Sequence, residues 1–226
     1  MGLGVAVTRV PVRKIRRTWR GNRGRLGAPK AGGRAEFEST LERDFYLMLE
    51  FDPTVARFTP QPIRLTYRGL SGRKKPYVPD TLVEYHRGRL PCLYEVKYVS
   101  DLRDDRDEYR LKFRAAREQA RDLGWTFCTA TERSIRGQVL KNIMFLRPFR
   151  DSNQVHSGEH LSIVLAWFAR PSTPRALLED RSLAERGVLL PVLWTLVARG
   201  ALRFDLGQPL TLDSPLSVDS GLVVKL

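Results

Sequence analysis

Residues 77–99 read YVPDTLVEYHRGRLPCLYEVKYV, and this stretch decides the fold. Two runs within it, 77–85 and 92–99, are rich in β-branched and aromatic residues. Between them, residues 86–89 (HRGR) have the composition of a turn. Two strand-forming runs around a short turn predict a β-hairpin.

The polar residues of this hairpin indicate a metal site. Asp80 and Glu95 fall on neighbouring strands, and Lys97 points to the same face as Glu95 because strand side chains alternate. Two facing carboxylates repel unless a cation lies between them, and oxygen ligands suit Mg²⁺ or Mn²⁺. Such a cation polarises a phosphodiester and lowers the pKa of a water molecule, while Lys97 would orient that water or neutralise developing negative charge. The alternative is an exposed strand face with surface ion pairs.

An amphipathic helix is predicted upstream, over residues 38–51. Leu41, Phe45, Met48 and Leu49 form one apolar stripe, and Glu42 lies at its margin. Pro53 ends this helix, because proline disfavours helical backbone in the residue before it. Residues 55–67 are then expected to form a strand.

The chain carries an ordered set of short motifs: residues 39–45 (STLERDF), 49–53 (LEFDP), 61–62 (QP), 79–80 (PD) and 95–97 (EVK). Together they resemble the TnsA endonucleases of heteromeric cut-and-paste transposons, from about residue 36 onward. The resemblance implies a restriction-endonuclease-like fold. It also implies cleavage of the 5′ strands at transposon ends, while a partner transposase, TnsB, cuts and joins the 3′ ends.

The same resemblance implies a set of site residues. Glu42 matches the family's helix-borne carboxylate and would complete the metal site directly or through water, and Asp80 matches the family's central metal ligand. Glu95 and Lys97 match the two polar positions of the second strand, and the backbone carbonyl of Val96 would complete the coordination of Mg²⁺.

Two positions on the family motifs, Glu95 and Gln61, bear on how the site is interpreted. The best-known member of the family has Gln where this chain has Glu95, so this chain is closer to the general PD-(D/E)xK pattern, which favours the metal interpretation. Gln61 also falls on a family motif, and we expect it to be structural rather than catalytic.

Length and composition are consistent with a cytoplasmic DNA-processing protein. A chain of 226 residues builds one domain with a sizeable core or two modest ones. No apolar run has the length of a membrane span, and the amino terminus does not have the pattern of a signal peptide. Cys92 and Cys128 are expected to be buried thiols, and the three histidines lack metal-site spacing.

The net charge of +14 is concentrated in a basic amino-terminal arm. Residues 1–34 hold ten Lys or Arg and no acid, whereas residues 151–226 hold seven basic and eight acidic residues. The arm is rich in glycine, so we expect it to be flexible and to grip DNA phosphates; a solvated tail or an acidic protein partner are the alternatives. The expected DNA-binding residues are Arg13, Lys14, Arg16, Arg17, Arg20, Arg23 and Arg25.

The nuclease domain is expected to span residues 35–150 as a mixed α/β sheet with flanking helices. A helix over 101–123 and a strand over 125–130 follow the hairpin. Another helix is predicted over 133–144, and residues 145–149 would end the domain.

Residues 151–226 predict a second, winged-helix-like domain. Helices are expected over 160–169, from 172 and over 187–199, followed by a hairpin wing over 202–212. The candidate recognition helix is almost wholly apolar, whereas DNA reading needs polar side chains at the groove. Contact with a protein is therefore favoured, and the TnsA resemblance implies the ATPase regulator TnsC. Residues 213–226 would be a flexible tail or a docking peptide.

Three functions are compatible with the sequence. The first is a Mg²⁺-dependent endonuclease subunit that works with TnsB and TnsC. The second is a stand-alone nuclease of the same fold that acts on branched or damaged DNA. The third is a non-catalytic protein that bridges DNA-bound transposase and regulator.

Overall fold

The structure, a computed structural model, describes residues 23–218 of the chain. The chain forms two compact units, Met1–Arg136 and Gly137–Leu226. The domain boundary was expected after residue 150. The observed boundary follows Arg136, because the helix Gln138–Asp151 belongs to the second unit.

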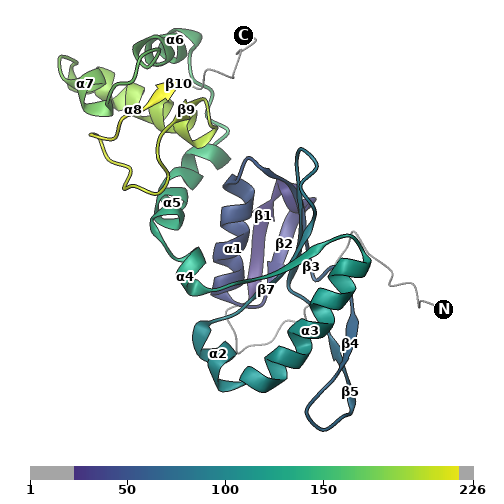
Figure 1. Ribbon diagram of the computed structural model, residues 1–226. Helices are drawn as coiled ribbons and strands as arrows, with labels where there is room; N and C mark the ends of the chain where they lie inside the picture. Colours follow the sequence, from purple (N-terminus) through teal and green to yellow (C-terminus); the bar gives the residue numbers. More distant parts are fainter. Residues whose placement is uncertain (1–22, 219–226) are drawn as a thin grey trace. The chain divides into compact units, whose positions relative to one another are not determined.

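The first unit is built on a four-stranded mixed sheet (Figure 1). Its strands are β3 (Val55–Pro60), β6 (Thr81–Tyr85), β7 (Cys92–Val96) and β8 (Thr126–Ala130), in the order β3-β6-β7-β8. The first two pairs are antiparallel and β7–β8 is parallel. The predicted mixed α/β sheet and the hairpin formed by β6 and β7 are thus confirmed.

Helices pack on both faces of this sheet. On one face, α1 (Thr40–Phe51) contacts β7 through Phe45, whose ring centroid lies 5.1 Å from that of Tyr94. On the other face, α3 (Arg106–Asp122) contacts β8 through Phe113, with 5.3 Å between its ring centroid and that of Phe127. Because side chains alternate along β7, the face toward α3 is the one that also presents Glu95.

Residues 24–37 form a small hairpin that the sequence did not predict. β1 (Gly24–Ala28) pairs antiparallel with β2 (Gly33–Phe37), and η1 (Pro29–Ala31) joins them. The turn places Gly32 and Gly33 at φ 77° and 110°, where glycine is favoured. The expectation of a flexible arm over residues 1–34 is therefore wrong from Gly24 onward, because Leu26, Ala28 and Ala35 supply buried side chains among the arginines.

A second hairpin interrupts two of the predicted strands. β4 (Leu65–Arg68) and β5 (Lys74–Tyr77) form a separate antiparallel ribbon. The predicted strand over 55–67 therefore breaks after Pro60, and the one over 77–85 breaks before Thr81. Proline explains both breaks, because Pro60, Pro62 and Pro79 cannot donate to a ladder.

The segment after β7 also differs from expectation. The strand predicted over 92–99 ends at Val96, and α2 (Val99–Asp104) follows. The helix predicted over 101–123 is thus two helices, α2 and α3, that meet at Asp105. Gly124, at φ 73°, follows the end of α3 as expected.

The helix predicted over residues 133–144 is also two helices. α4 (Glu132–Ile135) ends the first unit, and α5 (Gln138–Asp151) begins the second and includes the residues expected to close the nuclease domain.

Three further helices and a short sheet complete the second unit. They are α6 (Gly158–Trp167), α7 (Pro174–Leu178), α8 (Leu183–Ala198), β9 (Leu202–Arg203) and β10 (Ser217–Val218). Helix α8 supplies much of the core, and Trp194 is buried, as expected.

In the structure, the strand that pairs with β9 is not the one that was expected for the wing. β9 pairs with β10, whereas residues 210–212 were expected to pair there. Residues 213–218, expected to be tail, belong to the fold: Leu216 is buried and bridges to Ser172. Short polar strands carry too little periodicity for the sequence to fix this pairing.

Two remaining expectations concern thiols and membranes. Cys92 is buried as predicted, but Cys128 is exposed because it lies on β8, at the edge of the sheet. Across residues 23–218, no helix combines the length and the apolar character needed to cross a membrane.

Candidate active site

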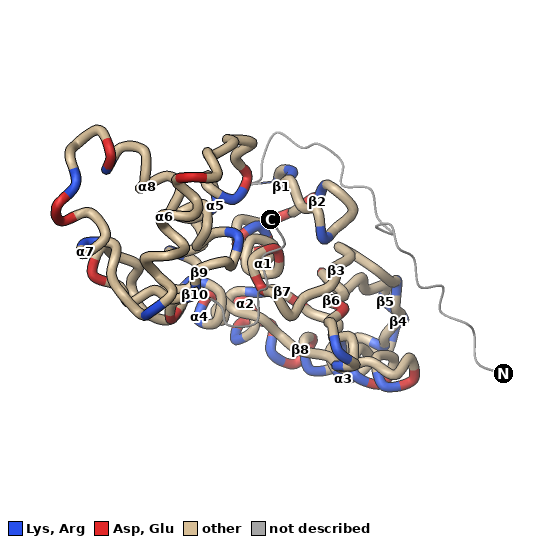
Figure 2. Tube along the Cα trace, turned by 90° about the horizontal axis from the view of Figure 1, so that it is seen from above, with Lys and Arg blue, Asp and Glu red and all other residues tan. Residues whose placement is uncertain are grey.

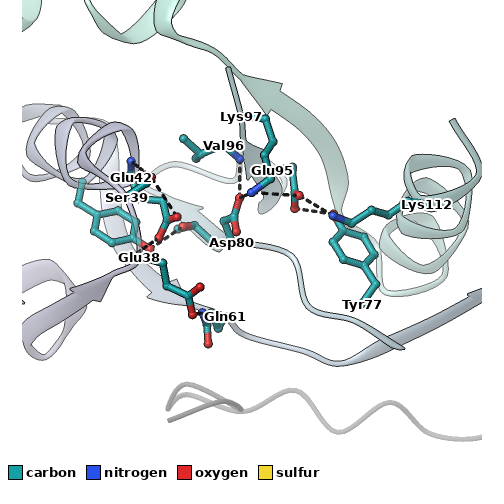
Figure 3. Close-up of polar contacts among 12 residues, drawn as sticks. Glu38, Ser39, Glu42, Gln61, Tyr77, Asp80, Glu95, Val96, Lys97 and Lys112 are labelled. Carbon is teal, nitrogen blue, oxygen red and sulfur yellow. Dashed lines mark hydrogen bonds and ion pairs between the residues drawn. The ribbon is translucent and has the colours of Figure 1, made fainter. Parts of the chain in front are cut away.

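The centre of the site is a pair of carboxylates on adjacent strands (Figure 3). Asp80 directly precedes β6, and its N–H donates to the carbonyl of Tyr94 at 3.1 Å, which places it beside Glu95. The N–H of Val96 donates to Asp80 Oδ2 at 2.7 Å. The backbone N–H and C=O of one strand residue point to the same side, so the Val96 carbonyl also faces Asp80.

Two lysines surround Glu95, whose side chain is only 1% exposed. Lys97 Nζ lies 3.7 Å from Glu95 Oε1 and 3.8 Å from Asp80 Oδ2, so it bridges the two carboxylates. Lys112, from α3, donates to Glu95 Oε1 at 2.8 Å. Tyr77 donates its hydroxyl to Glu95 Oε2 at 2.8 Å, so both carboxylate oxygens are held.

Burial and neighbouring charges shift the pKa of Asp80 and the pKa of Lys97. Burial, followed by the charge of Glu95, raises the pKa of Asp80 well above its ordinary value. Burial alone would lower the pKa of Lys97, but the charges of Asp80, Glu95 and Glu42 together raise it. Lys97 is therefore a cation at neutral pH, whereas the raised pKa of Asp80 means that burial disfavours its ionised form, which would gain from a nearby positive charge.

Glu42 has a structural role in addition to its expected chemical one. It lies in the first turn of α1, where its N–H donates to Ser39 Oγ at 3.1 Å. Its own carboxylate accepts from the N–H of Glu38 at 2.9 Å and from Ser39 Oγ at 3.2 Å. This resembles a capping box, and burial raises the pKa of Glu42. Its charge nevertheless acts on both Asp80 and Lys97, which places Glu42 at the margin of the cluster.

Gln61 is more closely tied to the site than its expected structural role suggested. Its backbone has a φ of 47°, and its N–H donates to the carbonyl of Asp80 at 2.8 Å. Its side-chain Nε2 donates to Glu38 Oε1 at 3.2 Å. Its Oε1 is buried without a hydrogen-bond partner among residues 23–218. An unsatisfied buried oxygen is costly, so this atom is available to a cation or a water molecule.

One cavity of about 540 Å³ lies in the first unit, and Glu42 is not among the residues that line it. Its walls include Gln61, Asp80, Glu95, Lys97, Tyr109 and Lys112. The cavity therefore lies between the sheet, α3 and the β4–β5 ribbon, with both carboxylates and both lysines facing into it.

The oxygen ligands of the cavity are too few to surround a metal ion completely, which fits Mg²⁺. Within residues 23–218, no group of three or more His, Cys, Asp or Glu side chains is placed to hold an ion. Mg²⁺, however, is commonly held by one or two carboxylates, with water and substrate phosphate as its other ligands. Asp80 and Glu95 meet that requirement.

Most of the residues expected to bind DNA lie outside the described part of the chain, namely Arg13, Lys14, Arg16, Arg17 and Arg20. Arg23 lies 3.5 Å from Glu38 through Nη2 and Oε2. Arg25 pairs with Glu36 at 2.8 Å on the β1–β2 hairpin. Both described residues are thus next to carboxylates.

Sequence reasoning missed Tyr77 and Lys112 as parts of the site. A signal for Lys112 was present, because it falls within the stripe that includes Tyr109, Phe113 and Ala116 on α3. A lysine on a buried helix face needs an anionic partner. The sequence does not identify Glu95 as that partner, because the packing of α3 on the sheet brings the two together.

The mixed sheet, its flanking helices and a cavity with two carboxylates and a lysine from successive strands define an endonuclease-like α/β domain. Residues 52–132 match the family model described as TnsA-like endonuclease N terminal. The resemblance to the TnsA endonuclease family is thereby confirmed over residues 52–132, which form a TnsA-like endonuclease domain. The matched range includes Gln61, Asp80, Glu95, Lys97 and Lys112. No curated protein matches the chain.

Proposed function

We propose that this protein is a Mg²⁺-dependent DNA endonuclease subunit of a heteromeric transposase. It cleaves the 5′ strands at transposon ends, together with a TnsB-like transposase and a TnsC-like ATPase. The observation that carries the proposal is the convergence of Asp80, Glu95 and Lys97 on one cavity of a TnsA-like endonuclease domain.

Each residue of the cavity has a role in this proposal. Asp80 and Glu95, with the carbonyl of Val96, would hold Mg²⁺, which supplies charge neutralisation at the scissile phosphate and acidifies water. Lys97 would orient the attacking water or stabilise the negative charge that develops on the phosphoryl oxygens. Glu42 adds a negative charge at the margin of the site, in keeping with its expected catalytic role.

Two contacts prepare the site before substrate binds. Lys112 and Tyr77 fix both oxygens of Glu95, so this carboxylate needs no reorientation on binding. Hydrolysis is expected to leave 5′-phosphate and 3′-hydroxyl ends, through in-line attack of water on phosphorus.

The second unit is proposed to be a winged-helix-like domain that binds the ATPase. Helix α8 is buried from Val192 to Ala198, so this segment is not available to a DNA groove. A cavity of about 560 Å³ in this unit is lined by four leucines, among them Leu183 and Leu190, and at its charged positions by Arg175, Glu179 and Arg186. Both features favour a protein partner over DNA.

The test is strand-specific cleavage of labelled transposon-end DNA in Mg²⁺, with and without the transposase and ATPase. Wild-type protein should nick the 5′ strand only with its partners, and Asp80→Ala should remove nicking. Asp122→Ala is the matched control, because Asp122 is exposed and lies outside the cavity.

The alternatives give different results in the same assay. Nicking without partners would identify a stand-alone nuclease. Absence of nicking by wild-type protein under every condition, with assembly of the partners intact, would identify a non-catalytic bridging protein. Normal nicking by Asp80→Ala would contradict the site assignment.

A further inference from the structure

The β4–β5 ribbon is the part of the first unit that the proposed chemistry leaves without a role. It projects beside α3 as a two-stranded sheet of its own (Figure 1). Residues 62–79, which contain it, hold five Lys or Arg and no Asp or Glu. Figure 2 shows basic segments at this ribbon and along α3.

The two faces of the ribbon differ in character. Leu65, Tyr67, Lys75 and Tyr77 share one face by register, and this face packs toward α3. The opposite face carries Thr66, Arg68, Lys74 and Pro76, all exposed. The ribbon is thus attached by an apolar face and presents a basic face to solvent.

Four of the five cations in residues 62–79 have no acidic partner among residues 23–218. Within residues 23–218, no acidic side chain forms an ion pair with Arg64, Arg68, Arg73 or Lys74, although Arg68 donates to the carbonyl of Gly72. In contrast, Lys75 on the inner face pairs with Glu108 at 2.6 Å. Exposed cations without a partner on one surface are the electrostatic mark of a polyanion site.

The ribbon also borders the active-site cavity. Arg64, at its start, and Pro76 and Tyr77, at its end, line that cavity together with Asp80. The basic face therefore begins where the scissile phosphate would lie. A two-stranded ribbon also has dimensions that the major groove of DNA admits, at about 12 Å wide.

We infer that the β4–β5 ribbon binds double-stranded DNA beside the cleaved phosphate, through backbone phosphates contacted by Arg64, Arg68, Arg73 and Lys74. This inference rests on the proposed endonuclease function and adds the surface that aligns the substrate with the cavity. Phosphate contacts position DNA without reading its sequence, so the ribbon sets orientation and leaves site choice to other contacts.

The experiment measures affinity of the full chain for a fluorescent duplex over a range of salt concentration, without divalent cations. The variant Arg68→Gln/Lys74→Gln removes two outer cations. The control Arg87→Gln/Arg89→Gln removes two exposed cations that follow β6, whereas Asp80 precedes it. The five residues of β6 separate these positions by roughly 16 Å.

The ribbon variant should bind roughly tenfold more weakly, with the slope of log K against log salt reduced by about 2, since each phosphate contact contributes about 0.9. The control variant should bind like wild type. Equal affinity and slope for wild type and ribbon variant would overturn the inference. A second result would also overturn the inference. If the ribbon variant binds DNA like wild type but no longer nicks in the complete reaction with the transposase, the ribbon contacts a protein partner and not DNA.

A crosslinking measurement keeps the inference testable if the double variant folds poorly. Ser71→Cys in a Cys128→Ser background places one exposed thiol at the ribbon tip, because Cys92 is buried. A photoreactive label there should crosslink to duplex DNA within a few base pairs of the nick, and crosslinks absent from that region would overturn the inference. Failure of wild-type protein to bind DNA would instead contradict the proposed function, so the two failures are distinguishable.

Discussion

Glu95 is the residue on which most contacts of the site converge. It is almost wholly buried, yet it accepts from Lys112 and Tyr77 and lies near Lys97. A buried ion pair stabilises little by itself, but removal of one partner leaves an uncompensated charge. Substitution of Glu95 or of one of its partners alone should therefore destabilise the protein more than substitution of both members of a pair.

Lys112→Met should lower the free energy of unfolding by roughly 3–5 kcal/mol, because it leaves Glu95 buried without its closest cation. Glu95→Gln should recover most of that loss in the double variant, since the amide oxygen still accepts from Tyr77. Urea unfolding of wild type, the two single variants and the double variant measures the coupling free energy between Lys112 and Glu95. Additive effects of the two substitutions would contradict this description of the pair.

Ser39 provides a second test at the residue scale. Its Oγ accepts from the N–H of Glu42 at the start of α1, so Ser39→Ala should cost about 1 kcal/mol of stability. Ser71→Ala, on an exposed loop, should cost little. Thermal unfolding of both variants checks this, and equal shifts in the two would show that the cap contributes nothing specific.

At the scale of elements, the attachment of the ribbon to α3 depends on Glu108. This carboxylate accepts from Lys75 Nζ and from the Tyr67 hydroxyl, both at 2.6 Å. The hydrogen bond from Lys75, followed by that from Tyr67, lowers the pKa of Glu108 from 4.5 to about 2. A lowered pKa stabilises the folded state above the unfolded-state pKa, and this contribution is lost as pH falls toward 2.

Glu108→Gln should therefore destabilise the protein by a constant amount above about pH 5. The difference from wild type should shrink between pH 4.5 and pH 2, where wild-type Glu108 takes up its proton. Chemical unfolding from pH 7 to pH 3 measures this. A difference that widens on acidification would contradict the assigned role, and Glu118→Gln, on the exposed side of α3, is the control.

The sequence predicted elements well where one strong periodic pattern persists. The hairpin of β6 and β7, helix α1 and the Gly124 stop were all apparent from local patterns. The β4–β5 ribbon was not, because prolines divide two continuous apolar runs and local composition does not say which sheet each half joins.

The site divides in the same way. Asp80, Glu95 and Lys97 were predictable because pairing and alternation in a hairpin fix their relation. The contact of Lys112 with Glu95 depends on how α3 docks, and no spacing rule links residues on a helix and a strand. Tyr77 was assigned to the wrong element, so its hydroxyl contact could not be foreseen.

At the scale of the whole molecule, the two compact units have separate cores. Leu93 is buried in the sheet of the first unit, and Leu193 is buried in α8 of the second. Leu→Ala at either position should cost about 2–5 kcal/mol in its own unit. Scanning calorimetry should show that each substitution shifts a different transition, whereas one transition shifted equally by both would indicate a single cooperative molecule.

Gln61 joins a backbone requirement and a chemical one at a single position. Its φ of 47° belongs to the left-handed region, where glycine and asparagine are favoured, while its buried Oε1 has no hydrogen-bond partner among residues 23–218. In terms of mutational tolerance, a saturation library at this codon should give two different answers. Selection for folding alone would enrich Gly and Asn, whereas selection for DNA cleavage would return Gln. The two selections would therefore separate the backbone requirement at this position from the chemical one.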